Sequence, residues 1–194
     1  QTLTTLPQRE VTSGWAEVIK YSLILDKGFF EFLETNVDKL KKLEPEAVTQ
    51  AIARSANIKA QVVSEDERER GKRTILNYGH TIAHGLEAAT GYCRFLHGEA
   101  VAIGMMGAAK LSRHLGLLPS NAVEQQQYLL QRFNLPVSSS QIDLREITKA
   151  MKLDKKMRGK AIRWVLLEDL GKAVVAASVP QHDVLDVLQE LLQP

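Results

Sequence analysis

Histidines are scarce in this sequence and are concentrated in one stretch. The chain has five, and three of them, His80, His84 and His97, fall within eighteen residues. His80 and His84 are four residues apart in a segment with a helical pattern, so both project from one helix face. Imidazoles at that spacing can share a divalent metal, and His97, at the start of the next predicted helix, offers a further ligand. The alternative is that these histidines simply belong to a helix surface or a packed core.

Glu17 is a carboxylate that can complete such a site. It lies in an apolar helical segment beside Trp15, Val18 and Ile19, with Lys20 one turn later on the same face. On an exposed surface this would be an ordinary ion pair worth about 0.2–0.5 kcal/mol. The apolar neighbours favour burial, where a carboxylate is costly unless it is paired or binds a metal. One carboxylate and two imidazoles leave an open position on zinc, as in catalytic sites.

Further polar side chains precede and follow the first histidine. Arg73, Asn77, His80, His84 and Glu87 recur every three or four residues and form one polar stripe on a predicted helix, and Lys59 and Glu69 come before it. Arginine and asparagine donors in such a row suit a phosphate or carboxylate ligand. A solvated helix face is the alternative.

A basic segment over residues 152–160 is interpreted as a solvated loop. A nucleic-acid patch is one alternative, but the segment lacks the interleaved aromatic residues of a single-strand binder. A loop lysine that contacts an anionic substrate is the other alternative.

Most of the chain has the apolar periodicity of helices. Residues 98–115 are small and apolar nearly all round, which predicts a central helix packed closely by its neighbours. The predicted helix over 44–64 has an apolar side that consists of Ala47, Ala51, Ile52, Ile58 and Val62. The other predicted helices are 8–25, a short one around residues 29–33, 74–90, 120–133, 142–151 and 181–192.

The exception to this helical pattern comes late in the chain. The runs 161–167 and 173–177 are β-leaning and are separated by a turn-like segment, which predicts a β-hairpin. The sequence therefore predicts a mainly α, multi-helix domain with a small antiparallel β-hairpin near residues 161–177.

The composition excludes several classes of protein. Of the 194 residues, 44% are hydrophobic and 25% charged, as in a soluble globular domain, and no apolar run approaches the length of a membrane span. The net charge of +2, with both signs interspersed, argues against a nucleic-acid binder. The single cysteine, Cys93, excludes an intrachain disulfide, is expected to be a packed thiol and indicates a cytoplasmic compartment. No glycine pattern forms a dinucleotide fingerprint or a P-loop.

Five motifs taken together resemble one family. They are Ser13–Tyr21, Asp66–Glu69, Asn77–His84, Leu96–Met105 and Asp154–Lys156. In order and spacing they resemble the C-terminal, helical domain of 3-dehydroquinate synthase over nearly the whole chain. The resemblance implies a single metal- and substrate-binding domain over residues 1–194, with the family's N-terminal NAD-binding domain absent from this chain. The opening on Gln1 agrees with a piece of a larger protein.

The resemblance also implies a reaction and its cofactors. The family converts a small sugar phosphate, 3-deoxy-D-arabino-heptulosonate 7-phosphate, into 3-dehydroquinate and phosphate in the shikimate pathway. The steps are oxidation by NAD, phosphate elimination, reduction and aldol closure. The implied cofactors are Zn²⁺ or Co²⁺ and an NAD bound mainly by the N-terminal domain, and the implied full-length assembly is a homodimer. The isolated chain is expected to be inactive, and no nucleic acid or membrane partner is expected.

Site residues follow from the resemblance position by position. Glu17, His80 and His97 match the family's metal ligands. The catalytic positions are matched by His84, which serves proton transfer and is not a ligand, by Lys20 and by Glu69. The substrate-binding positions are matched by Lys59, Arg73, Asn77 and Lys155, with Lys156 as the alternative to Lys155.

Three other functions compete with this reading. The first is another sugar-phosphate cyclase, such as a 2-deoxy-scyllo-inosose synthase, against which the combination of Arg73, Asn77 and His84 argues. The second is a metal-dependent polyol dehydrogenase, which the spacing of Glu17 to Lys20 and of Asn77 to the histidines disfavours. The third is a non-catalytic helical module that binds a metal or a partner.

Overall fold

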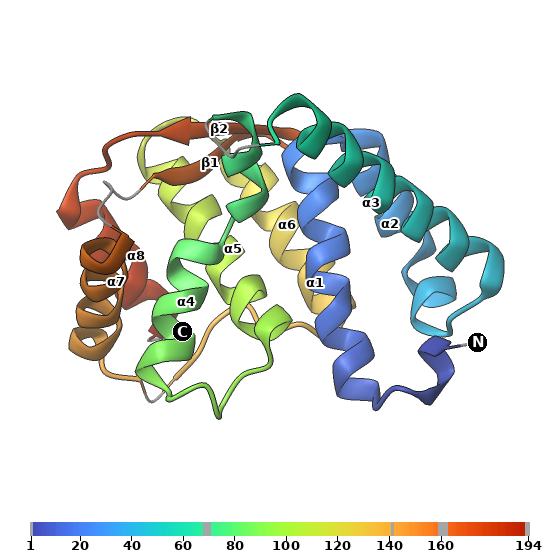
Figure 1. The fold of residues 1–194 in the computed structure, drawn as a ribbon, viewed down its shortest axis with the longest axis horizontal. Coiled ribbons are helices and arrows are strands. Elements are labelled where there is room, and N and C mark those ends of the chain that lie inside the picture. The colour runs from blue at the N-terminus through green and yellow to red at the C-terminus, as the bar shows by residue number, and fades with distance from the viewer. Residues whose placement is uncertain (1, 68–70, 141, 159–162, 193–194) are drawn as a thin grey trace.

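The computed structural model describes residues 2–67, 71–140, 142–158 and 163–192, with the backbone alone for residues 152–158. Within these ranges the chain is mainly helical with one antiparallel hairpin, as predicted (Figure 1). The elements are η1 (Thr2–Thr5), α1 (Gln8–Leu25), α2 (Lys27–Lys41), α3 (Pro45–Glu65), η2 (Lys72–Asn77), α4 (His80–Ala89), α5 (His97–His114), α6 (Ser120–Arg132), α7 (Leu144–Arg158), β1 (Trp164–Asp169), β2 (Lys172–Ala176) and α8 (Gln181–Leu192).

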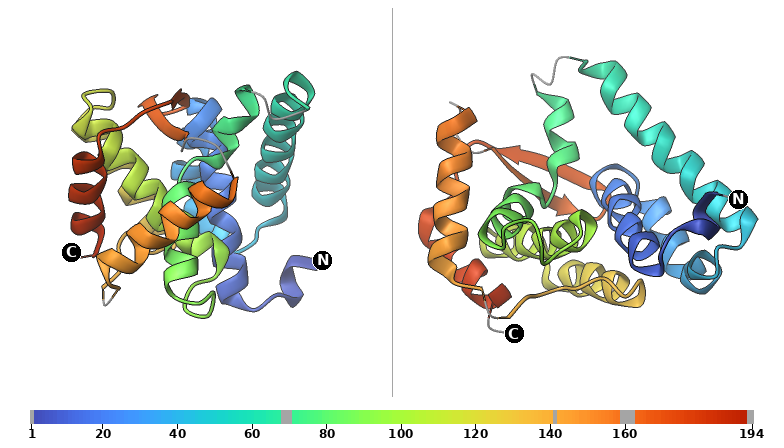
Figure 2. Two further views of the ribbon diagram at one scale, coloured as in Figure 1. Left: turned by 60° about the vertical axis from the view of Figure 1, so that its left-hand side comes forward. Right: turned by 60° about the horizontal axis from the view of Figure 1, so that its bottom comes forward.

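Helix α5 is the centre of the molecule. It packs against α1, α4, α6, α8 and β1, and nearly all of its residues from Gly98 to Ser112 are buried. Figures 1 and 2 show α1, α2 and α3 to one side of it and α7 and α8 to the other. The small side chains allow this close packing on every face, and the prediction of a central buried helix is confirmed.

The β-hairpin covers one end of the helices. Strands β1 and β2 pair antiparallel, with Leu166 opposite Val174, and the turn between them contains Gly171 at a φ of 83°. The Gly171 N–H donates a hydrogen bond to the Leu23 carbonyl of α1 at 2.8 Å. The hairpin is thus attached to the C-terminal end of the helix that carries Glu17.

Helix α3 packs through most of its predicted apolar side. Ala47, Ala51, Ile58 and Val62 are buried in the core. Periodicity predicts that Ile52 packs with them, but this residue is 52% exposed. A rotation of about 100° per residue separates it from the buried Ala51, so the prediction for Ile52 was wrong.

The predicted helix over 74–90 is in fact two elements. The 3₁₀ helix η2 ends at Asn77, and α4 begins at His80 after a turn in which Gly79 has a φ of 81°. A side chain on Gly79 would meet Met105, and one on Gly104 would overlap the Gly79 carbonyl oxygen. The chain thus turns at Gly79, at the point where these two glycines allow α4 and α5 to approach closely. Arg73 and Asn77 therefore do not share one helical stripe with His80 and His84, and the prediction that they do was wrong.

Three other predictions were wrong. The helix predicted as a short one around residues 29–33 is α2, which runs from Lys27 to Lys41. Helix α7 continues to Arg158, beyond the predicted end at residue 151, so residues 152–158 are helical rather than a loop. This part of the sequence contains strong helix formers and no glycine before Gly159, which explains the continuation. Cys93 is exposed rather than packed. None of the helices in the described ranges combines the length and the apolar composition that a membrane span needs.

Candidate metal and active site

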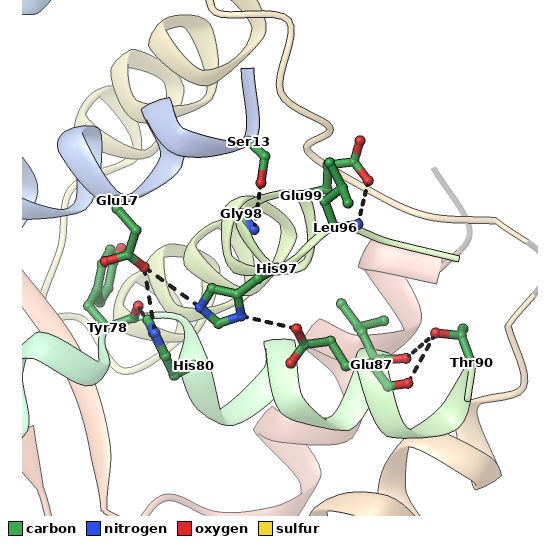
Figure 3. Close-up of polar contacts among 11 residues, drawn as sticks. Ser13, Glu17, Tyr78, His80, Glu87, Thr90, Leu96, His97, Gly98 and Glu99 are labelled. Carbon is green, nitrogen blue, oxygen red and sulfur yellow. Dashed lines mark hydrogen bonds and ion pairs between the residues drawn. The ribbon is translucent and has the colours of Figure 1, made fainter. Parts of the chain in front are cut away.

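The N-terminal end of α5 lies directly against α1. The Gly98 N–H donates to the Ser13 hydroxyl at 3.0 Å, and a side chain at Gly98 would overlap the Ser13 carbonyl oxygen. Arg9 of α1 also forms two 2.7 Å contacts with the Glu99 carboxylate, which in turn accepts the Leu96 N–H at the start of α5. These contacts fix how the two helices meet; Figure 3 shows those of Ser13 with Gly98 and of Leu96 with Glu99.

Glu17, His80 and His97 converge where α1, α4 and α5 meet. Glu17 lies one turn after Ser13, His97 directly precedes Gly98, and His80 opens α4. The Glu17 Oε1 atom is 3.6 Å from His80 Nε2 and 3.9 Å from His97 Nε2 (Figure 3). One ligand atom from each residue lies within 4.8 Å of the other two.

The other ring nitrogen of each histidine is already hydrogen bonded. His80 Nδ1 lies 3.2 Å from the Tyr78 carbonyl oxygen, and His97 Nδ1 lies 3.0 Å from Glu87 Oε1. A carbonyl and a carboxylate only accept, so Nδ1 carries the proton in both rings. In the neutral form of either ring, Nε2 then presents its lone pair towards Glu17.

Lys20 occupies the other oxygen of the Glu17 carboxylate. Its Nζ donates to Glu17 Oε2 at 2.6 Å, and the residue is only 3% exposed. Burial lowers the pKa of Lys20 and the charge of Lys59 on α3 lowers it further, while the Glu17 pairing opposes both effects. From the sequence alone, the Glu17–Lys20 pair could have been an ordinary ion pair on the surface. The structure shows instead that Lys20 is buried.

The donor set suits a divalent metal. Glu17 Oε1 is a buried carboxylate oxygen with no hydrogen-bond partner among the described residues, which is costly unless a cation or proton occupies the space before it. Burial, helped by the positive charge of Lys20, lowers the pKa of His80 to about 4, so its imidazole is neutral, as a metal ligand must be. Donors around tetrahedral zinc lie about 3.3 Å apart, so the three ligand atoms, now up to 4.8 Å from one another, would close in around an ion.

One other predicted site residue, His84, lies beside this group. The His84 ring, one turn after His80 on α4, has its centroid 5.7 Å from that of His80. Half-buried Arg73 donates from its guanidinium to the Glu67 carbonyl at 3.1 Å, and half-buried Asn77 ends η2. Glu69 lies outside the described residues, as does the side chain of Lys155.

Comparison with known proteins gives this geometry a family. A family model described as 3-dehydroquinate synthase C-terminal matches residues 14–157. The chain belongs to this family. It is 47% identical over 188 residues to the 3-dehydroquinate synthase of Halorhodospira halophila, and 48% over 187 residues to that of Nitrosomonas europaea. These alignments cover 97% and 96% of the chain but 53% and 51% of the relatives, so it spans about half of their length.

Solved structures share the fold and bind cofactors. A 2-epi-5-epi-valiolone synthase from Streptomyces hygroscopicus, solved with NAD⁺ and Zn²⁺, matches with a TM-score of 0.88 at 26% identity and covers 97% of this chain and 53% of that one. A 2-deoxy-scyllo-inosose synthase, solved with carbaglucose-6-phosphate, NAD⁺ and Co²⁺, matches with a TM-score of 0.83 at 30% identity, over 97% of this chain and 54% of that one. The relatives in sequence are 3-dehydroquinate synthases, and these structural neighbours are related cyclases.

Three contributions to the site were not identified from the sequence. All three help to position the ligands. They are the contact of Ser13 with Gly98, the Tyr78 carbonyl that accepts from His80, and the Glu87 carboxylate that accepts from His97. Gly98 and Glu87 were visible only as a small residue in a buried helix and as one member of a polar stripe. Their roles depend on how α1, α4 and α5 meet, which local spacing does not encode.

Proposed function

We propose that this chain is the metal- and substrate-binding domain of a 3-dehydroquinate synthase. The enzyme would convert 3-deoxy-D-arabino-heptulosonate 7-phosphate into 3-dehydroquinate and phosphate. The observation that carries the proposal is the convergence of Glu17 Oε1, His80 Nε2 and His97 Nε2, with His84 beside them. The names of the relatives in sequence support the reaction over that of a sister cyclase.

Glu17, His80 and His97 would hold Zn²⁺ or Co²⁺, the ions present in the related cyclases. Such an ion, when bound, polarises substrate hydroxyl and carbonyl oxygens as a Lewis acid. Burial keeps the His80 imidazole neutral without a metal, and Lys20 holds the Glu17 carboxylate through its other oxygen. His84 lies beside these ligands and would transfer the proton of the hydroxyl that is oxidised.

Cationic and amide side chains around the metal site would orient the substrate. The substrate carries a carboxylate and a phosphate, for which lysine and arginine are the usual partners. Lys20, Lys59, Arg73 and Asn77 are the described residues that we assign to this task, and Glu69 and Lys155 complete the proposed set. Holding the doubly anionic substrate in a ring-like conformation brings its reacting carbons together. Such positioning accounts for a large part of the rate acceleration in ring closures.

NAD binding is assigned to the half of the relatives that this chain does not match. We therefore expect no phosphate release by residues 1–194 alone with NAD and Zn²⁺, because the oxidation step lacks its bound cofactor. Joining the chain to the N-terminal half of the Halorhodospira halophila relative, at the aligned position, should restore release from 3-deoxy-D-arabino-heptulosonate 7-phosphate. A malachite-green assay for phosphate measures both. NAD-dependent release by the isolated chain would contradict the domain assignment.

The same joined protein tests the substrate. With saturating NAD and Zn²⁺, it should release phosphate from the heptulosonate and not from glucose 6-phosphate, the phosphate ester that the carbaglucose analogue of the related synthase mimics. Release from glucose 6-phosphate alone would assign the chain to a sister cyclase. A homodimer and a cytoplasmic location are further parts of this proposal, and sedimentation of the joined protein tests the dimer.

A further inference from the structure

His97 is held from behind by a second carboxylate. Glu87, in the last turns of α4, places Oε1 at 3.0 Å from His97 Nδ1, on the side of the ring that faces away from Glu17 (Figure 3). The His97 side chain is 50% exposed, whereas that of Glu87 is only 12% exposed. The carboxylate is thus the more enclosed of the two partners, and the proposed metal ligand is the more exposed.

This contact decides which nitrogen of His97 can bind a metal. Free neutral imidazole can carry its proton on either nitrogen, and only the unprotonated nitrogen is a ligand. A carboxylate acceptor at Nδ1 places the proton there and leaves the Nε2 lone pair directed at Glu17 Oε1, 3.9 Å away. A carboxylate that holds a metal-binding histidine in this way also raises the basicity of the ligand.

We propose that Glu87 is a positioning residue of the metal site, which fixes the tautomer and the orientation of His97. The inference deepens the proposed function and rests on its metal site. Glu87 is assigned no contact with substrate or metal, and it acts through His97 alone.

The two histidines are positioned by different means. His80 Nδ1 is held by the Tyr78 carbonyl, and Tyr78 is buried with its hydroxyl 2.9 Å from Gln126 Oε1. A backbone acceptor cannot be removed by a side-chain substitution. Glu87 is therefore the positioning group whose role a substitution can test.

The first test needs no metal. In the 194-residue chain labelled with ¹⁵N-histidine, at a pH where the rings are neutral, the ring nitrogen shifts should show His97 as the Nδ1–H tautomer. Glu87→Gln should keep that tautomer because its amide oxygen still accepts the hydrogen bond. Glu87→Ala should shift His97 towards the Nε2–H tautomer, which is the form that blocks binding through Nε2. An Nδ1–H tautomer that persists in Glu87→Ala would overturn the proposal.

The second test uses Co²⁺ as the probe, followed by its visible absorption. Glu87→Ala should raise the Co²⁺ dissociation constant about 10–100-fold, the range typical of such supporting groups, and Glu87→Gln should raise it less. Glu190→Ala is the matched control, since Glu190 is also a carboxylate beside a histidine, 3.3 Å from His114 Nε2 between α8 and α5. It should leave the dissociation constant unchanged.

The outcomes separate this inference from the proposed function. If Glu87→Ala and the unsubstituted chain bind Co²⁺ with the same dissociation constant, the positioning role of Glu87 is overturned. The metal site itself then still stands. An unsubstituted chain that binds no Co²⁺ would refute the metal site itself, and the tautomer measurement would still decide whether Glu87 orients His97. Circular dichroism of each variant shows that the helices are retained.

Discussion

Replacing His80 by alanine is expected to raise the Zn²⁺ dissociation constant of the chain by more than about 100-fold, because the loss of a ligand exceeds the 10–100-fold effect of a supporting group. His80 Nε2 is one of three donors at the site, and its ring is largely buried with Nδ1 fixed by the Tyr78 carbonyl. Calorimetric titration with Zn²⁺ measures this directly. The joined enzyme with the same substitution should release no phosphate.

His84→Ala is the matched control, because it removes an imidazole from the same face of α4 one turn away. His84 lies beside the ligand group but is not part of it. Zn²⁺ affinity should therefore change by less than about threefold, while phosphate release falls by about 10²–10⁴-fold, the usual contribution of a proton-transfer group. If the two substitutions weakened Zn²⁺ binding equally, the ligand assignment would be wrong.

Gly98→Ala is expected to be the most damaging single-methyl change near the site. The added carbon would overlap the Ser13 carbonyl oxygen, a backbone atom that cannot move without shifting α1. Overpacking of this kind costs about 1–3 kcal/mol, and more where backbone must move. Because Glu17 follows Ser13 by one turn and His97 precedes Gly98, the shift would also separate two ligands. We expect a lower free energy of unfolding in urea and at least about tenfold weaker Co²⁺ binding.

Gly14→Ala provides the comparison within the same contact region. Gly14 lies in α1 next to Ser13, and a side chain there would meet no atom within 4 Å. Alanine in a helix interior is about 1 kcal/mol more favourable than glycine, so this variant should be as stable as the unsubstituted chain or more so. A Gly98→Ala protein with unchanged stability and Co²⁺ affinity would mean that the contact with Ser13 does not hold the ligands together.

Local patterns predicted the elements well where the chain is regular. Residues 8–25 and 181–192 coincide with α1 and α8, and the hairpin follows the two β-leaning runs. The break before α4 was missed because it depends on the φ of Gly79 and on its approach to Gly104, a contact between distant parts of the chain.

The site shows the same division between local and tertiary information. Spacing alone pointed to His80 and His84 as a metal-binding pair, whereas the resemblance implied Glu17, His80 and His97. The described structure brings the second set together, because close packing of Gly98 on Ser13 places His97 beside Glu17. The role of Glu87 could not be derived from its position in a polar row, since its partner comes from another helix.

The most direct test of the metal site is anomalous diffraction from crystals of the zinc-loaded chain, recorded on both sides of the zinc absorption edge. A single strong peak should lie about 2.0–2.2 Å from Glu17 Oε1, His80 Nε2 and His97 Nε2, with His84 outside the coordination shell. A peak bound by His80 and His84 together, or zinc found only on surface residues, would contradict the account.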